Sequence, residues 1–499
     1  MPGAGRATLQ SAMTSVASIA RPRDEHVNAR RPPRGVLLAV TAGTAARLVL
    51  AALVPITVDE AYYAQWAGNL QPGYLDHPPL VAWLMRAGLA LGPGTLAARL
   101  PAIVLIAGTT LLAASLVRAR AGDRAAVVAA VLLQAAPVFS LGGALMTPDA
   151  PLAFAWVGAL WSLDRAVRRD PRWLVATGLF LGIGALSKLT AGLLGLAMAA
   201  ALLSTARGRA LLATRWALAG VLVAVAVAAP VVAWNVARGF PSLAFQAEHG
   251  MRGRSFSAAR LAASLGAQAA YVSPVLLAAA GVAAFRPLRS PDPLLRATAW
   301  SALPIVVFFT AAASLTPGAL PHWPAPGWLS ATLLLALAGG PWLRPAAATG
   351  LAITAAGVIA ISAAGLLGAP PRLDPLGEMR GWREGARAAV DASGGARLAV
   401  AHWIALGQIG WYAGAPVAYV GARPCAASFY SPDPRAQGEP LLVVVREGLG
   451  PSRTELEARL GPLAPAGGVD VPIEGGAVRR FSFLRWTPPV PPIRPAGSP

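Results

Sequence analysis

Charged side chains are scarce in this chain of 499 residues, only 13% of which are Asp, Glu, Lys or Arg. A soluble domain carries about 25%. Hydrophobic residues make up 56% of the chain, and many stand in runs of roughly 20, the length that crosses a bilayer as a helix. These features exclude an ordinary soluble protein and predict a polytopic membrane protein.

Cysteine and lysine are almost absent. Cys425 is the one cysteine, which excludes a disulfide framework and a thiolate zinc cluster. Lys188 is the one lysine among 42 lysine and arginine residues. The formal net charge is +20, but in a membrane protein basic residues gather in cytoplasmic loops. We therefore interpret the charge as topology and expect no nucleic-acid partner.

The apolar runs predict eleven membrane-spanning helices after a basic tail. Residues 1–34 lack the order of a signal peptide and are predicted to be a disordered cytoplasmic tail. The expected spans are 35–56, 97–117, 125–142, 149–163, 173–187, 190–204, 215–235, 267–285, 297–314, 327–340 and 346–368. The predicted fold class is therefore an all-α polytopic domain over residues 35–368.

The distribution of basic residues predicts the orientation. With the N-terminus inside, the tail and inner segments hold 20 arginines, whereas the outer loops of this domain hold seven basic residues. This asymmetry follows the positive-inside rule. It predicts a bacterial inner-membrane protein whose C-terminal region lies outside the cytoplasm.

The sequence changes character after residue 368. Pro370, Pro371 and Pro375 mark a boundary, after which strand-like and helix-like runs alternate. The strand-like runs are Arg397–Ala401, Pro416–Val420 and Leu441–Val445, and the helix-like runs are Trp382–Asp391 and Thr454–Leu460. This pattern predicts a small α/β extracytoplasmic domain over 369–487, followed by a disordered proline-rich tail over 488–499.

Two adjacent carboxylates, Asp59 and Glu60, directly follow the first apolar run. On a helix they point about 100° apart, so one can face a cavity while the other supports structure or a metal. A carboxylate near an apolar interface can serve as a general base. The alternative is that both complement the dipole at a helix N-terminus.

The same loop continues to Asp76 and His77. Asp76 can cap a helix that has Pro78 and Pro79 in its first turn. His77 can bind phosphate, shuttle a proton or ligate a metal, although most single histidines do none of these.

Further candidates lie at the outer ends of later spans. Thr147 and Pro148 are typical of a helix start that would orient Asp149 outward. Lys188 lies at membrane depth, where a charge needs a partner such as a lipid phosphate, or else snorkels to the surface. His322 is a candidate contact for sugar or phosphate. The alternative is that it packs in the belt of aromatic residues at the membrane surface. Arg47, inside the first span, is expected to pair with an acid.

Five motifs, and the order in which they follow one another along the chain, resemble those of a known superfamily. They are Asp-Glu-Ala-Tyr-Tyr at 59–63, Tyr-Leu-Asp-His-Pro-Pro-Leu at 74–80, Thr-Pro-Asp-Ala-Pro at 147–151, Ser-Lys-Leu-Thr at 187–190 and His-Trp-Pro at 322–324. The chain resembles the bacterial branch of the dolichyl-phosphate-mannose protein mannosyltransferase superfamily. That branch comprises glycosyltransferase family 39 and the aminoarabinose transferases, which have the GT-C fold.

The resemblance implies a glycosyltransferase with an outward-facing site and a polyprenyl-phosphate sugar as donor. It implies that Asp59 acts as, or positions, the catalytic base with inversion at the anomeric carbon, and that Glu60 supports it. It implies that residues of the five motifs contact the sugar donor or its phosphate. The candidates are Tyr62, Tyr63, Asp76, His77, Asp149, Lys188 and His322. The aminoarabinose transferases have an acid-Arg-Tyr variation where this chain has Tyr62 and Tyr63, so that sugar is not implied.

Several properties stay open at this stage. The sugar is a hexose or a pentose, and the acceptor is an envelope lipid, polysaccharide or protein. A divalent metal is possible, since His77, Glu60 and Asp149 could supply ligands, but no cofactor is required by any spacing. A polyprenyl-lipid flippase or transporter is the alternative function, and an inactive scaffold is a third. The absence of an internal repeat favours the enzyme over the transporter.

Overall fold

The computed structural model describes residues 31–251, 255–317, 319–366, 374, 376–431, 433–473 and 476–488. The chain divides into two units. The helical unit comprises Met1–Val54 and Pro72–Ile359, and the sheet unit comprises Pro55–Gln71 and Ala360–Pro499. This division differs from the predicted domain boundaries, because the segment after the first apolar helix belongs to the sheet unit.

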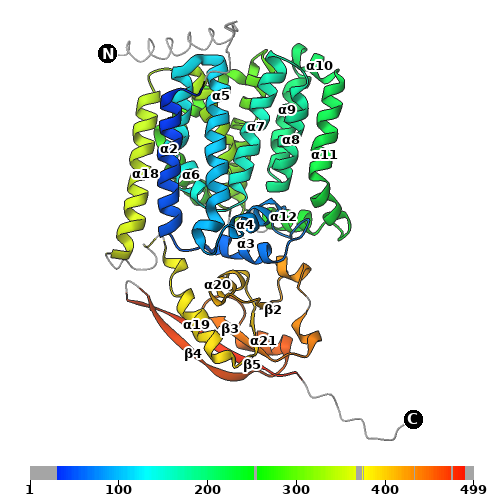
Figure 1. The fold of residues 1–499 in the computed structure, drawn as a ribbon, viewed down its shortest axis with the longest axis vertical. Helices are drawn as coiled ribbons and strands as arrows, with labels where there is room; N and C mark the ends of the chain where they lie inside the picture. The colour runs from blue at the N-terminus through cyan, green and yellow to red at the C-terminus, as the bar shows by residue number, and fades with distance from the viewer. Residues whose placement is uncertain are drawn as a thin grey trace, which may run out of the picture. The chain divides into compact units, whose positions relative to one another are not determined.

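Apolar helices make up the helical unit, and Figure 1 shows several of them running side by side. The helices are α2 (Arg34–Leu53), α4 (Leu80–Leu89), α5 (Thr95–Ala135), α6 (Pro137–Ser140), η2 (Gly142–Ala144), α7 (Asp149–Arg168), α8 (Trp173–Ser187), α9 (Ala191–Leu203), α10 (Ala206–Leu212), α11 (Arg215–Val236), α12 (Pro241–Met251), α13 (Ala258–Val272), α14 (Pro274–Phe285), η3 (Arg286–Arg289), α15 (Pro293–Trp300), α16 (Leu303–Leu315), α17 (Ala325–Ala338) and α18 (Leu343–Leu366).

Five candidate spans in the described part are long and apolar enough to cross a membrane, or up to seven if each of two bent helix pairs counts as one. Three further apolar helices, α4, α8 and α17, have 10–17 residues. The prediction of many membrane helices is confirmed in this form, whereas the count of eleven stays a prediction. The tail over 1–34 lies outside the described residues up to residue 30, and α2 begins at Arg34.

Breaks and close contacts in this unit have local causes. Gly122 has a φ of 83° and interrupts α5 where two separate spans were predicted. Glycine takes this conformation without a steric penalty. Gly178 of α8 lies against Gly220 of α11, and a Cβ on Gly178 would stand 1.8 Å from the Gly220 carbonyl oxygen. The two helices therefore pack backbone to backbone at this crossing.

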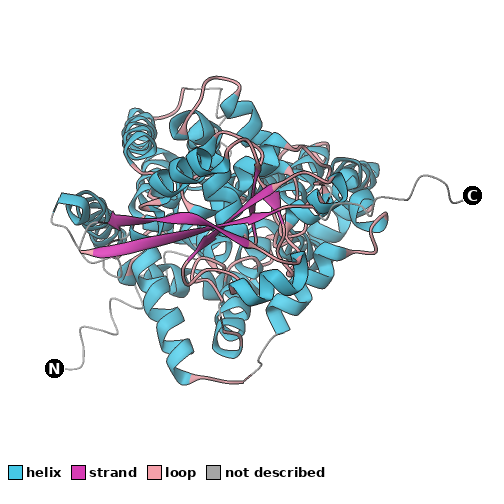
Figure 2. Cartoon of the chain, turned by 90° about the horizontal axis from the view of Figure 1, so that it is seen from below, coloured by secondary structure: helices cyan, strands magenta, loops and turns pink. Residues whose placement is uncertain are grey.

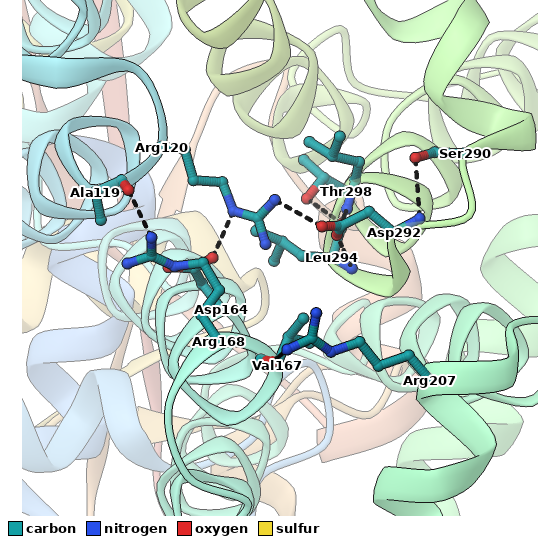
Figure 3. Close-up of polar contacts among 11 residues, drawn as sticks. Ala119, Arg120, Asp164, Val167, Arg168, Arg207, Ser290, Asp292, Leu294 and Thr298 are labelled. Carbon is teal, nitrogen blue, oxygen red and sulfur yellow. Dashed lines mark hydrogen bonds and ion pairs between the residues drawn. The ribbon is translucent and has the colours of Figure 1, made fainter. Parts of the chain in front are cut away.

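A buried ion network joins three helices of this unit (Figure 3). The Nε atom of Arg120 on α5 lies 2.5 Å from Asp164 on α7, and its Nη1 atom lies 2.8 Å from Asp292, the N-cap of α15. Arg168 also binds Asp164, at 3.2 Å. The side chain of Asp164 is fully buried, so these partners offset the cost of removing its charge from water.

Arg47 corrects one prediction. Its side chain is buried on α2, as expected, but its Nη2 atom donates to the Gln134 side chain at 2.8 Å and to the Phe139 carbonyl at 2.9 Å. The expected acidic partner is therefore wrong: two neutral oxygens accept the hydrogen bonds.

The sheet unit contains one five-stranded sheet in the order β2-β1-β3-β5-β4. Strand β1 pairs in parallel with β2 and β3, whereas β5 pairs antiparallel with β3 and β4. Figure 2 shows the strands in magenta. The elements of this unit are α3 (Val58–Gly68), η4 (Gly377–Met379), α19 (Trp382–Ser393), β1 (Arg397–Val400), α20 (Trp403–Ala413), β2 (Ala418–Tyr419), η5 (Ala426–Phe429), η6 (Pro434–Gln437), β3 (Leu441–Arg446), α21 (Arg453–Leu460), β4 (Ala464–Ile473) and β5 (Ala477–Trp486).

Every strand-like and helix-like run predicted after residue 368 coincides with an element of this list. The β4–β5 hairpin and α20 were not predicted. Strand β4 contains Gly467 and Gly468 and a register shift between Pro465 and Gly468, and glycine and proline are depleted in strands. Of the three boundary prolines, Pro370, Pro371 and Pro375, none lies in the described residues.

Candidate functional site

An ion pair forms where α7 begins and α8 ends in the helical unit. The Nζ atom of Lys188, which directly follows α8, donates to Asp149 Oδ1 at 2.8 Å. Asp149 is the first residue of α7, and no side chain caps this helix. The predicted Thr147 cap is therefore wrong, and the helix begins one residue later than expected. The pair is part-exposed: the side-chain exposure is 13% for Lys188 and 35% for Asp149.

Two histidines join this pair. His322 lies in the turn before α17, and its Nε2 atom is 4.0 Å from Asp149 Oδ2. His77, in the loop before α4, interacts electrostatically with Lys188, Asp149 and His322. Residues far apart in the sequence, at 77, 149, 188 and 322, therefore gather into one cluster, which we call the Lys188 cluster.

The cluster favours neutral histidines. Burial, followed by the charge of Lys188, lowers the pKa of His77 to about 3, although Asp149 acts in the opposite direction. Burial also lowers the pKa of His322, opposed by Asp149. At neutral pH both rings are thus uncharged and can each donate one hydrogen bond. Lys188 is then the single cation of the cluster, and Asp149 is its single anion.

The loop that carries His77 is anchored by α12. The Ser242 hydroxyl donates to the Tyr74 carbonyl at 2.8 Å, and the Gln246 amide donates to the Asp76 carbonyl at 2.8 Å. Gly73 fits against the Trp234 ring, which a Cβ would approach to 2.9 Å. These anchors were not predictable from a local pattern, because the two hydrogen-bond donors lie 168 and 170 residues away along the chain.

Asp76 does not cap α4. This helix begins at Leu80 with Pro79 as N-cap residue, and no side-chain hydrogen bond caps it. The predicted cap is therefore wrong, because the helix begins three residues after His77 and its N-cap position is occupied by Pro79. The contact of Asp76 with the polyprenyl-phosphate sugar donor stays a prediction.

Asp59 and Glu60 lie in the first turn of α3, in the sheet unit. Glu60 is fully buried, and its carboxylate accepts hydrogen bonds from the Thr57 backbone N–H at 3.1 Å and from the Thr57 hydroxyl at 3.0 Å. The Thr57 hydroxyl in turn accepts from the Glu60 N–H, which completes a capping box. Glu60 thus fixes the helix start, and the neighbouring Asp59 is partly exposed.

Tyr62 and Tyr63 are also buried. The Tyr62 hydroxyl accepts a hydrogen bond from the Ala426 N–H at 2.8 Å, and its ring lies 5.3 Å from the ring of Trp403. Tyr63 packs edge-on against Trp66. Tyr62 thus helps to hold the sheet unit together, and the contacts of Tyr62 and Tyr63 with the sugar donor stay predictions.

Metal ligands do not cluster in the part of the chain that the structure describes: it contains no group of three or more His, Cys, Asp or Glu side chains placed to hold an ion. Of the three ligands considered from the sequence, His77 and Asp149 belong to the helical unit and Glu60 to the sheet unit. The Glu60 carboxylate binds Thr57.

Comparisons with known proteins agree with the motifs. The family described as dolichyl-phosphate-mannose-protein mannosyltransferase matches residues 76–234. A lipid A galacturonosyltransferase, RgtD from Rhizobium johnstonii, is 28% identical over 324 residues, which are 60% of this chain and 65% of that protein. The chain thus spans slightly less than two thirds of the length of this relative.

Two crystal structures share the fold. ArnT from Cupriavidus metallidurans bound to undecaprenyl phosphate has a TM-score of 0.65 and 18% identity, covering 90% of this chain and 97% of that one. Its apo state gives a TM-score of 0.64 at 20% identity with the same coverage. Together these matches confirm the resemblance to the superfamily and the mostly helical GT-C-like fold.

Proposed function

We propose that this chain, a member of the GT-C superfamily, is an integral-membrane glycosyltransferase that moves a sugar from a polyprenyl-phosphate donor to an acceptor outside the cytoplasm. The observation that carries the proposal is the Lys188 cluster, a lysine held at the ends of apolar helices beside two neutral histidines. The related proteins support it: one is named a lipid A galacturonosyltransferase, and one of similar fold binds undecaprenyl phosphate.

The cluster suits a lipid phosphate. Lys188 has three N–H donors, and Asp149 takes one of them in the described structure. The other two, with N–H groups of His77 and His322, would bind phosphate oxygens. When the sugar leaves, negative charge grows on the phosphate, and a cation fixed in a site of low polarity stabilises that charge.

The proposed transfer needs one base, which takes the proton of the acceptor hydroxyl. The acceptor hydroxyl oxygen attacks the anomeric carbon while the bond from that carbon to the phosphate oxygen breaks, which inverts the configuration. The hydroxyl proton passes to the Asp59 carboxylate, and the polyprenyl phosphate leaves. Glu60 then positions Asp59 through the capping box, since its own carboxylate is occupied by Thr57.

Orientation and acceptor belong to the same proposal. The arginine asymmetry supports an inner-membrane protein with Asp59 and the sheet unit outside the cytoplasm. The lipid A transferase among the relatives makes an envelope lipid the first acceptor class to test, followed by polysaccharide and protein.

Sugar transfer by purified protein in detergent tests the proposal. The donors are undecaprenyl- and decaprenyl-phosphate sugars, and the readout is released prenyl phosphate. We expect Asp59→Asn to lower the rate by about 10²–10⁴-fold, the usual contribution of a general base. Asp391→Asn, which changes an exposed acid on α19, is the matched control and should be silent.

The flippase alternative gives a different result in this experiment. If no donor is turned over by the folded protein while the lipid crosses reconstituted vesicles, the glycosyltransferase proposal fails.

A further inference from the structure

Two glycines of α20 face α3 inside the sheet unit. A Cβ on Gly407 would lie 2.6 Å from the backbone nitrogen of Tyr62 and 2.8 Å from the carbonyl carbon of Ala61. A Cβ on Gly410, one turn later, would lie 2.4 Å from the amide nitrogen of the Gln65 side chain. Real Cβ atoms do not approach so closely, so a methyl group at either position would force a neighbouring group to shift.

The two contacts differ in what can yield. The Gln65 amide is the end of a flexible side chain and can rotate away from a methyl group. The Tyr62 nitrogen and Ala61 carbon are backbone atoms in the second turn of α3, so only a shift of a whole helix would make room at Gly407. Gly407 therefore fixes the distance between the two helix backbones.

Other contacts hold α3 to the same unit. Tyr62 receives its hydrogen bond from Ala426 at 2.8 Å, and the Gln408 amide lies 3.5 Å from the Ile56 carbonyl, just before the Thr57 cap. Asp59 lies between these two attachments, and the Gly407 contact at residues 61–62 begins two residues after it. The backbone of Asp59 is thus located by the sheet unit on both sides.

We infer that Gly407 is a positioning residue for the Asp59 carboxylate and that the sheet unit serves to place this base. The inference rests on the proposed function, in which Asp59 takes the acceptor proton. A base must reach its proton at about 2.6–3.2 Å, and a misplacement of about 1 Å can cost about 10²-fold in rate. A methyl group at Gly407 has to displace α3 by a distance of this order.

The test compares Gly407→Ala with Gly410→Ala in the full-length protein. Both substitutions add one methyl group to the same helix and gain equally in helix propensity. We expect Gly407→Ala to lower kcat at least 10-fold with the donor KM unchanged, because the residues proposed to bind phosphate lie in the helical unit. Gly410→Ala should stay within about twofold of wild type.

Amide hydrogen exchange provides a readout that does not depend on activity. In Gly407→Ala, exchange should rise in residues 58–68 and stay unchanged in β3 and β5. Gly385→Ala is the control for general damage to this unit, because its methyl group would meet the Phe481 ring under α19 at 2.4 Å. It should alter exchange in β5 and leave residues 58–68 unchanged.

The inference is overturned if α3 exchanges faster in Gly407→Ala at an unchanged kcat, if α3 exchange does not change, or if Gly385→Ala gives the same kinetic loss and the same exchange pattern. Failure of the proposed function looks different: the wild-type protein then turns over no donor, or Asp59→Asn retains full transfer activity, whatever the Gly407 variant does to α3.

Discussion

Two ion clusters of the helical unit differ in burial and in the number of partners of each charge. Around Asp164 the carboxylate is fully buried and binds two arginines, and Arg120 also reaches the N-cap Asp292. In the Lys188 cluster, one lysine meets one part-exposed aspartate beside two neutral histidines. A buried network with several ion pairs stabilises one arrangement of helices, whereas a cation with one ion pair and access to its surroundings can bind an anionic ligand. Burial and partner number therefore separate structural charges from candidate functional charges here.

The largest effect is expected from removing Arg120. Arg120→Met leaves Asp164 and Asp292 without their shared partner, and breaking a buried pair costs about 3–5 kcal/mol. The free energy of unfolding in detergent should fall by this amount, as measured by denaturant titration. The control is Arg118→Met, whose partner Asp123 is 63% exposed, and it should cost at most about 1 kcal/mol. Equal losses in both variants would remove the distinction between buried and exposed pairs.

A smaller free-energy change, seen in catalysis, is expected at Lys188. Lys188→Gln keeps a hydrogen-bond donor but removes the charge, so kcat should fall about 10²-fold, which corresponds to about 2.7 kcal/mol. Thermal stability should change little, since the pair is part-exposed. Arg344→Gln, an exposed cation at the start of α18, is the control. A transfer rate within a few fold of wild type would show that the cluster is structural, like the network around Asp164.

The smallest effect is the pH dependence contributed by His77. Its pKa is about 3 in the folded chain and 6.5 ordinarily, so below pH 6.5 the unfolded chain takes up a proton that the folded chain does not. The stability contributed by the neutral ring is therefore lost progressively as the pH falls from 6.5 toward 3. His77→Gln removes this titration, and its Tm should fall less than that of wild type between pH 7.5 and pH 5. Identical decreases would contradict the burial of a neutral ring.

The polar residues of the candidate site are recognisable from the sequence, but their partners are not. Lys188 and Asp149 were each singled out at a helix end, and their pairing required α7 and α8 to pack, which a local pattern does not encode. For Arg47 an acid was expected on general grounds, whereas the fold supplies the Gln134 side chain and the Phe139 carbonyl. Buried arginines need acceptors, but only packing decides whether these acceptors carry charge.

The sheet unit shows the same limit. Short apolar runs predicted β1 and β3, because buried parallel strands are rich in Val and Leu, but β4, with its glycines and prolines, had no such signal. The attachment of α3 to this unit was also not predictable, since 55–71 and 360–499 are far apart in the sequence.

By itself the sequence determined the membrane class, the helical fold and the candidate residues for the site, because hydrophobic length and residue type are local properties. Only the tertiary structure decided which charges are buried with several partners, which histidines share a cluster with Lys188, and which unit holds Asp59. These depend on contacts between distant segments, where burial and partners set the energy of each charge.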